Sequence, residues 1–253
     1  MLKLTKYEFR KNLTAPIILL IVIGILELLF LVSVAIGKED YIALAFGIQM
    51  LPLIFSYFIV LILSISSYSR ELRSKSSYMT FMAPVSTYKI VGSKLLSSLL
   101  TAILFAAILF IVLPLNVTII GIRYNEIDNF FDMVDVFMQA FDYSIAELLL
   151  NVIMIAVEIM ISFYLIVVLA YLAITLSSTV FQDKKFKGFF SAIIFAVLYG
   201  TASYIAVNIP ETMEATSLVE AFVATLPVML FYLVCIVSGF FATGALLEKK
   251  VSL

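Results

Sequence analysis

The sequence predicts an all-α polytopic membrane protein with six transmembrane helices, and two observations predict this class. First, the 253 residues are 64% hydrophobic and only 13% charged, whereas soluble domains are roughly half apolar and about a quarter charged. Second, the apolar residues gather into six runs, each near or beyond the roughly 20 residues that a helix needs to cross a bilayer. Short polar segments separate the runs, and no Gly/Ser linker or soluble domain interrupts them.

The composition excludes several classes of function. The chain has no His and a single Cys, Cys235, inside an apolar run. These counts exclude disulfides within the chain, zinc sites built on His or Cys, and His-dependent catalysis. A P-loop is also missing, because Gly239 and Gly244 have the right spacing but Ala245 and Leu246 follow them. We therefore expect a chain that is not an enzyme, with no metal, no cofactor of its own and no nucleic-acid partner.

The N-terminal segment, residues 1–13, predicts an interfacial helix on the cytosolic surface, with a frayed basic tail as the alternative. It holds four basic residues and one acidic residue, and Leu2, Phe9 and Leu13 share a helical face. The apolar run that follows is about 22 residues long and lacks an A-x-A cleavage site. It therefore predicts a first span at 15–37 rather than a signal peptide.

The later elements follow from the same patterns of apolar runs and polar breaks. A second span at 42–67 is followed by a charged cytosolic segment at 70–93 and a third span at 94–121. An outer amphipathic helix at 124–143 precedes a fourth span at 144–177. A fifth span at 188–208 and a last apolar stretch at 218–247 complete the chain. The outer helix is expected because apolar side chains recur at helical spacing with Asp residues between them. The last stretch exceeds one bilayer crossing, and Pro227 is expected to divide it into a re-entrant piece and a sixth span.

The distribution of basic residues predicts the orientation. With the N-terminus inside the cell, only Lys38 and Arg123 of the 16 basic residues lie outside. Cytosolic segments carry an excess of Lys and Arg, so this orientation is strongly favoured. We expect a multi-pass protein of the plasma membrane with both termini in the cytosol.

The charged segment between spans two and three has the pattern of a helix, a stop and a second helix. Residues 70–82 contain helix formers without Gly or Pro, and Pro84 should end the helix. Ser86 or Thr87 can then cap a helix that continues through Lys94 into the third span. A short helix at the base of a bundle is a surface on which a cytosolic partner could push; the alternative is a positively charged loop that only fixes topology. The candidate coupling residues are Arg70, Glu71, Arg73, Ser74, Lys75, Ser76, Ser77, Tyr78, Met79 and Thr80.

This segment resembles the ABC-2 type permeases of ATP-binding-cassette exporters. An acidic residue after a span, Glu71, is followed by a polar run and then by Pro84-Val85-Ser86, Ile90-Val91 and Lys94. The family often has a Gly and a Leu-Leu pair between the acid and the Pro, where this chain has Ser74 to Ser77 and Phe81-Met82. The six-span layout matches over nearly the full length.

The resemblance implies that residues 1–253 form one transmembrane domain, with the N-terminal helix as the family's elbow helix. It implies two permease subunits, identical or paralogous, and two copies of a separate ATPase that binds ATP and Mg²⁺. The helix at 70–83 would sit in a groove of that ATPase. The chain is similar to the small permeases of lantibiotic immunity and of phenol-soluble-modulin export, which implies export of an amphipathic or hydrophobic substrate, with an amphipathic peptide as the best guess.

Ionisable residues inside spans are the second group of candidates, because charge in a bilayer is costly and often functional. The candidates are Glu27 in span one and the glutamates of a polar stripe on span four. The members of this stripe lie within roughly 80° of one another around the helix: Glu147, Asn151, Met154, Glu158 and Ser162. The stripe predicts either the lining of a translocation path or a hydrogen-bonded packing seam. An ion-coupled secondary transporter that uses Glu27 and Glu158 is the alternative function. An intramembrane enzyme is disfavoured because the chain lacks His.

Span five carries small residues at four-residue spacing: Gly188, Ala192, Ala196 and Gly200. Small residues in register let two helices approach closely in a membrane. The pattern predicts helix packing, either within the bundle or at a dimer seam.

Overall fold

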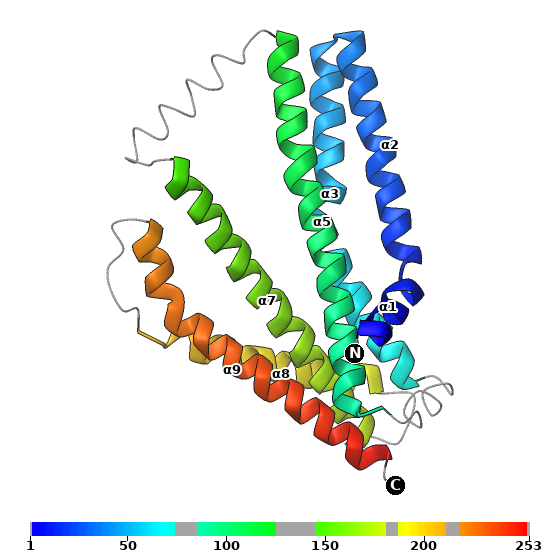
Figure 1. The fold of residues 1–253 in the computed structure, drawn as a ribbon, viewed down its shortest axis with the longest axis vertical. Helices are drawn as coiled ribbons and strands as arrows, with labels where there is room; N and C mark the ends of the chain where they lie inside the picture. Colours follow the sequence, from blue (N-terminus) through cyan, green and yellow to red (C-terminus); the bar gives the residue numbers. More distant parts are fainter. Residues whose placement is uncertain (1, 74–84, 125–144, 181–186, 211–217, 252–253) are drawn as a thin grey trace. The chain divides into compact units, whose positions relative to one another are not determined.

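A computed structural model of the chain describes residues 2–73, 85–124, 145–180, 187–210 and 218–251, and the elements in these ranges are helices (Figure 1). They are α1 (Leu2–Lys11), α2 (Thr14–Ile36), α3 (Glu39–Arg73), α5 (Thr87–Tyr124), α7 (Ile145–Val180), α8 (Lys187–Val207) and α9 (Leu218–Val251). Six of them, all except α1, are long and apolar enough to cross a membrane. The expected class of an all-helical, multi-pass membrane protein is confirmed at this level.

Local sequence explains the bounds of α2. Pro16 lies in its first turn, where a missing backbone N–H breaks no helical hydrogen bond. The helix ends at Gly37, which adopts the left-handed conformation with φ of 77°. The N–H of Gly37 donates to the carbonyl of Ser33 at 3.1 Å and so satisfies one of the last carbonyls of the helix.

The second spanning helix ends later than expected and includes the first residues of the charged segment. Helix α3 continues to Arg73, so Arg70 and Glu71 belong to the end of a spanning helix. Helix α5 begins at Thr87 and continues through Lys94 into the span, as the capping pattern predicted. The expected helix at 74–82 and the outer amphipathic helix at 125–143 lie outside the described residues.

The expected break at Pro227 is wrong, because α9 runs through it as one continuous helix. Proline removes one backbone donor, so only the bond to the carbonyl four residues earlier is lost. In an apolar surrounding the remaining backbone groups have no better partners than their own helix, which keeps the helix intact. Pro52 in α3 and Pro114 in α5 are accommodated in the same way.

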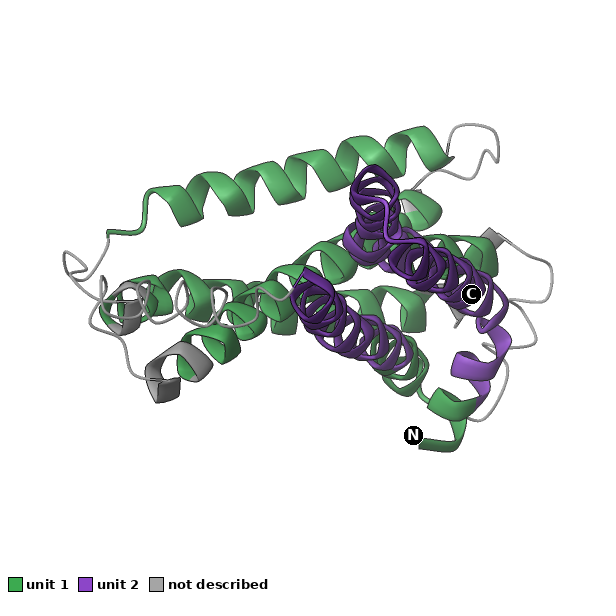
Figure 2. Cartoon of the chain, turned by 90° about the horizontal axis from the view of Figure 1, so that it is seen from above, with its two compact units in different colours: residues 1–6, 64–96, 149–253 green, residues 7–63, 97–148 purple. Residues whose placement is uncertain are grey.

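The chain forms two compact units (Figure 2). Unit 1 contains residues 1–6, 64–96 and 149–253, and unit 2 contains residues 7–63 and 97–148. Unit 1 therefore includes the end of α3, the start of α5, nearly all of α7, and all of α8 and α9. Unit 2 includes α2 and the longer parts of α3 and α5.

The core of unit 1 joins α7, α8 and α9. Its members are Leu165, Leu169 and Ala202, against which Phe195, Leu198, Phe231, Tyr232, Cys235 and Ile236 pack. Close approach of α7 and α9 depends on Gly239, because a Cβ there would lie 2.8 Å from Cγ1 of Val168.

The small residues of α8 lie on a different face from the one that packs in this core. Ala192, Ala196 and Gly200 are exposed, and the space beside Gly200 is open. Within the chain, α8 packs through Phe195, Leu198 and Ala202 instead. The interpretation of the stripe as a seam with a second subunit stays a prediction.

We predict that Gly37→Ala lowers the melting temperature of the protein in detergent. The left-handed conformation costs a residue with a Cβ about 1–2 kcal/mol, and the new Cβ would overlap the guanidinium of Arg123. Gly24→Ala is the matched control, since this glycine lies inside α2 with open space around it. Alanine is favoured there by roughly 0.5–1 kcal/mol. The two changes should move the melting temperature in opposite directions, and a stabilising Gly37→Ala would contradict the assigned conformation.

Candidate functional site

A buried ion pair joins the two helices that flank the charged segment. Lys94 of α5 donates from Nζ to Oε2 of Glu71 near the end of α3. Both residues are buried, with 7% of Glu71 and 5% of Lys94 exposed. Removing either partner would take away the opposite charge that this bond supplies to the other, so the pair helps to hold α3 against α5.

Aromatic and hydroxyl side chains connect the same end of α3 to α7. The hydroxyls of Tyr68 and Thr175 lie 2.6 Å apart, and those of Ser64 and Tyr171 lie 3.0 Å apart. The rings of Tyr68 and Tyr171 stack with centroids 4.0 Å apart. Ser64, Tyr68 and Glu71 recur at helical spacing, so one face of α3 carries both this network and the ion pair.

The start of α5 is fixed to α9. The hydroxyl of Thr87 donates to the carbonyl of Gly244 at 3.1 Å. The ring of Tyr88 lies 6.2 Å from that of Phe240 and 6.0 Å from that of Phe241, measured between centroids. A Cβ on Gly244 would overlap the Tyr88 ring, so glycine permits this contact.

We call Tyr68, Glu71, Thr87, Lys94 and Thr175 the base cluster. Its members lie on α3, α5 and α7, and Thr87 adds a bond to α9. Residues 74–84 connect the two helix ends that this cluster holds. Because buried, hydrogen-bonded side chains resist separation, a force applied to the connecting segment would be passed to these four helices together.

The candidate coupling residues divide between described and undescribed positions. Arg70 is exposed, whereas Glu71 is buried in the ion pair. Arg73 is the last residue of α3, and its side chain lies outside the described residues. So do Ser74, Lys75, Ser76, Ser77, Tyr78, Met79 and Thr80.

Glu27 lies in a separate polar cluster in unit 2, formed by three spanning helices. Gln49 of α3 donates from its amide to Oε2 of Glu27. Asn116 of α5 lies 3.3 Å from the same oxygen and donates to Oε1 of Gln49 at 3.0 Å. The side chains of Gln49 and Asn116 are completely buried. The two amides thus solvate a carboxylate inside a spanning segment, where water is absent.

The polar stripe of α7 faces the neighbouring helices of unit 1. Glu158 lies seven residues before the core residue Leu165, which is a difference of only about 20° around a helix. Its Oε1 accepts a hydrogen bond from Thr225 of α9 at 3.1 Å. Asn151 is buried, and its amide has no hydrogen-bond partner among the residues that the structure describes. Ser162 is half-buried, and the side chain of Glu147 lies outside the description.

Sequence reasoning found the acidic members of these clusters but missed most of their partners. Gln49, Asn116, Thr175 and Thr225 were not singled out, although each is a polar residue within an apolar run. A polar residue within an apolar run is therefore the signal that could have found them, because a polar side chain in a spanning helix needs a partner. In the described ranges, no three His, Cys, Asp or Glu side chains gather in a way that could hold a metal ion.

We predict that Lys94→Met lowers the melting temperature by several degrees. The loss should correspond to about 3 kcal/mol or more, because Glu71 would remain buried without the cation that Lys94 supplies. The double variant Glu71→Leu with Lys94→Met should lose less than the sum of the single variants. Arg70→Gln, a change at the exposed neighbour of Glu71, is the control. Additive effects of the two single variants would contradict a direct ion pair.

We predict that Asn116→Leu destabilises the chain by about 1–3 kcal/mol, because Glu27 and Gln49 would each lose a hydrogen-bond partner. Thr118→Val on the same helix is the control, since Thr118 is exposed and, among the described residues, its hydroxyl bonds only to the carbonyl of Pro114 in its own helix. Thermal unfolding in detergent would compare the two variants. An equal effect of both changes would show that the cluster contributes nothing to stability.

No protein-family model matches the chain, and comparison with curated proteins and with solved structures gives no match. The resemblance to ABC-2 permeases therefore rests on the quoted residues of the charged segment and on the six-span layout. It stays a prediction.

Proposed function

We propose that the chain is the transmembrane permease subunit of an ATP-driven exporter of the ABC-2 type. It would move an amphipathic or hydrophobic substrate out of the cell, and we propose an amphipathic peptide as that substrate. Two permease subunits and two copies of a separate ATPase, which binds ATP and Mg²⁺, would form the complete exporter. Both termini would lie in the cytosol, where ATP is available.

The base cluster is the observation that best supports this proposal. A subunit that is driven by a partner needs a contact segment and a stiff connection from that segment to the spans. Residues 74–84 would supply the contact, and the buried pair of Glu71 and Lys94 would supply the connection. Because the bond from Thr87 to Gly244 also holds α9, movement of the segment would displace helices as a group rather than bend one of them.

In this mechanism the chain performs no bond chemistry. The ATPase dimer would close on ATP and push the 74–84 segment against the base cluster. The ion pair would keep α3 and α5 together during that movement, since separating two charges in an apolar surrounding is costly. The spans would then exchange between two packed arrangements, which alternately expose the substrate path to each side of the membrane.

We predict that replacing residues 74–82 with a Gly/Ser sequence abolishes transport and substrate-stimulated ATP hydrolysis. The melting temperature should remain near that of the parent, because the replacement spares Glu71, Thr87 and Lys94. A Gly/Ser replacement of residues 211–216, in a loop expected on the opposite side of the membrane, is the control. Transport that survives the first replacement and remains coupled to ATP hydrolysis would rule out the proposed coupling role.

The presence of the partner can be tested separately by affinity purification from native membranes followed by mass spectrometry. An ATPase with a P-loop should co-purify with the chain, and its absence would count against the exporter.

The cluster around Glu27 favours one alternative, an ion-coupled secondary transporter. A carboxylate held by two buried amides inside a spanning unit is a group that could take up and release a small cation. This function would need no ATPase. Transport by the purified chain alone in liposomes, driven by an ion gradient and lost in Glu27→Gln, would favour the alternative over the exporter.

A further inference from the structure

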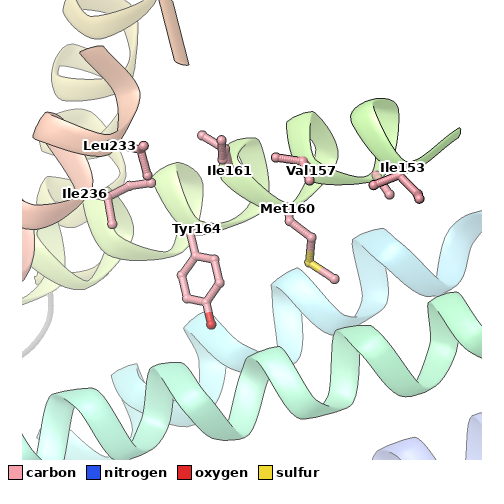
Figure 3. Close-up of a pocket in the computed structure, with 8 residues that line it drawn as sticks. Ile153, Val157, Met160, Ile161, Tyr164, Leu233 and Ile236 are labelled. Carbon is pink, nitrogen blue, oxygen red and sulfur yellow. The ribbon is translucent and has the colours of Figure 1, made fainter. Parts of the chain in front are cut away.

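An apolar groove of about 520 Å³ runs along α7 and is completed by α9, with all its lining residues in unit 1 (Figure 3). They are Ile153, Ala156, Val157, Met160, Ile161, Tyr164, Leu233 and Ile236. Figure 3 shows Met160 and Tyr164 extending from the same side of α7. The lining from Ile153 to Tyr164 covers about 16 Å of helix, at 1.5 Å per residue, so the groove is elongated.

The groove is open along its side. Ile153 is 61% exposed, and Val157 and Leu233 are each 42% exposed. The one polar group of the lining, the hydroxyl of Tyr164, already donates to the carbonyl of Leu95 at 3.3 Å. An alkyl chain therefore fits the lining, and it could enter sideways from the bilayer.

Glu158 adds a negative charge beside this groove. It lies between the lining residues Val157 and Ile161 in sequence, and it bonds to Thr225 on α9, the other helix that lines the groove. Glu158 is the only charged residue in the span Leu150–Thr179 of α7, and α9 has none between Phe222 and Leu247. The sign of the charge beside the groove is thus set by this carboxylate.

The described residues satisfy the carboxylate of Glu158 incompletely. The hydroxyl of Thr225 has a single hydrogen and two acceptors in reach, Glu158 at 3.1 Å and the carbonyl of Phe222 at 2.9 Å. When Thr225 bonds to its own helix, which threonine commonly does, Glu158 loses that donor. Within the described part of the chain, no Lys or Arg forms an ion pair with Glu158. A cation supplied by a ligand would compensate the charge.

We infer that this groove binds a cationic amphiphile, with its alkyl chain along Met160, Tyr164 and Ile236 and its ammonium group at Glu158. The complementarity of an apolar groove and one adjacent carboxylate selects this class over neutral and anionic chains. The inference rests on the proposed function only in taking the ligand to be the transported substrate. Binding itself needs no ATPase.

The test uses the absence of tryptophan from the chain. Leu233→Trp places the only tryptophan in the groove, and Val234→Trp places it outside the lining at a position that is 65% exposed. The purified full chain in lipid vesicles is titrated with bromine-labelled dodecylamine, dodecanol or dodecyl sulfate. Bromine quenches tryptophan on contact, and the Val234→Trp signal corrects for the different partitioning of the three probes into lipid.

After this correction, the amine should quench Leu233→Trp at a concentration about tenfold lower than the alcohol, a ratio equivalent to about 1.4 kcal/mol. The sulfate should be the weakest of the three probes. Adding Glu158→Gln should bring the amine and the alcohol to within about twofold of each other. Equal quenching by the amine and the alcohol, or a preference that persists in Glu158→Gln, would overturn the inference and leave a groove that only lipid chains fill.

The comparison of the three probes needs only the Leu233→Trp and Val234→Trp variants. It therefore remains decisive even where Glu158→Gln fails to fold. The result is also independent of the ATPase. Selective quenching without a co-purifying ATPase would uphold the binding site and count against the exporter. A co-purifying ATPase without selective quenching would support the exporter and refute the binding site.

Discussion

The structure depends on the need of each polar group in an apolar surrounding for a partner. Apolar side chains gain little by exchanging lipid for another helix, so they do not determine by themselves which helices pair. The buried pair of Glu71 and Lys94 does restrict this pairing, because a buried charge needs an opposite charge close to it. The bonds from Tyr68 to Thr175 and from Thr87 to Gly244 extend the same constraint to α7 and α9.

Much of the fold could be predicted from the sequence, because length and apolar composition decide whether a helix can span a bilayer. The beginning of α5 at Thr87 followed from Pro84 and the hydroxyl residues after it. The break at Pro227 was wrong because a proline gives a reliable helix end only where water or other groups can satisfy the freed carbonyl. In a span, the helix has no better alternative, and α9 continues.

The candidate sites could be predicted only in part. An acidic residue in a span is visible by its type, which identified Glu27 and Glu158. Its partner lies on another helix, and helical periodicity describes one helix at a time. Gln49 and Thr225 therefore became recognisable only once the helices were packed. The stripe of α8 shows the same limit, since the spacing of Ala192 and Gly200 indicates a close-packing face without saying which helix packs there.

The three acidic clusters differ in how well their charge is balanced, and this difference orders their roles. Glu71 has a lysine beside it, so an opposite charge balances its own, as the proposed coupling role requires. Glu27 has two amide donors that solvate its charge without neutralising it. Glu158 shares one threonine proton with a backbone carbonyl and lies beside an open apolar groove. The least balanced of the three carboxylates has the most to gain from a ligand, and Glu158 is the one next to residues that line the groove.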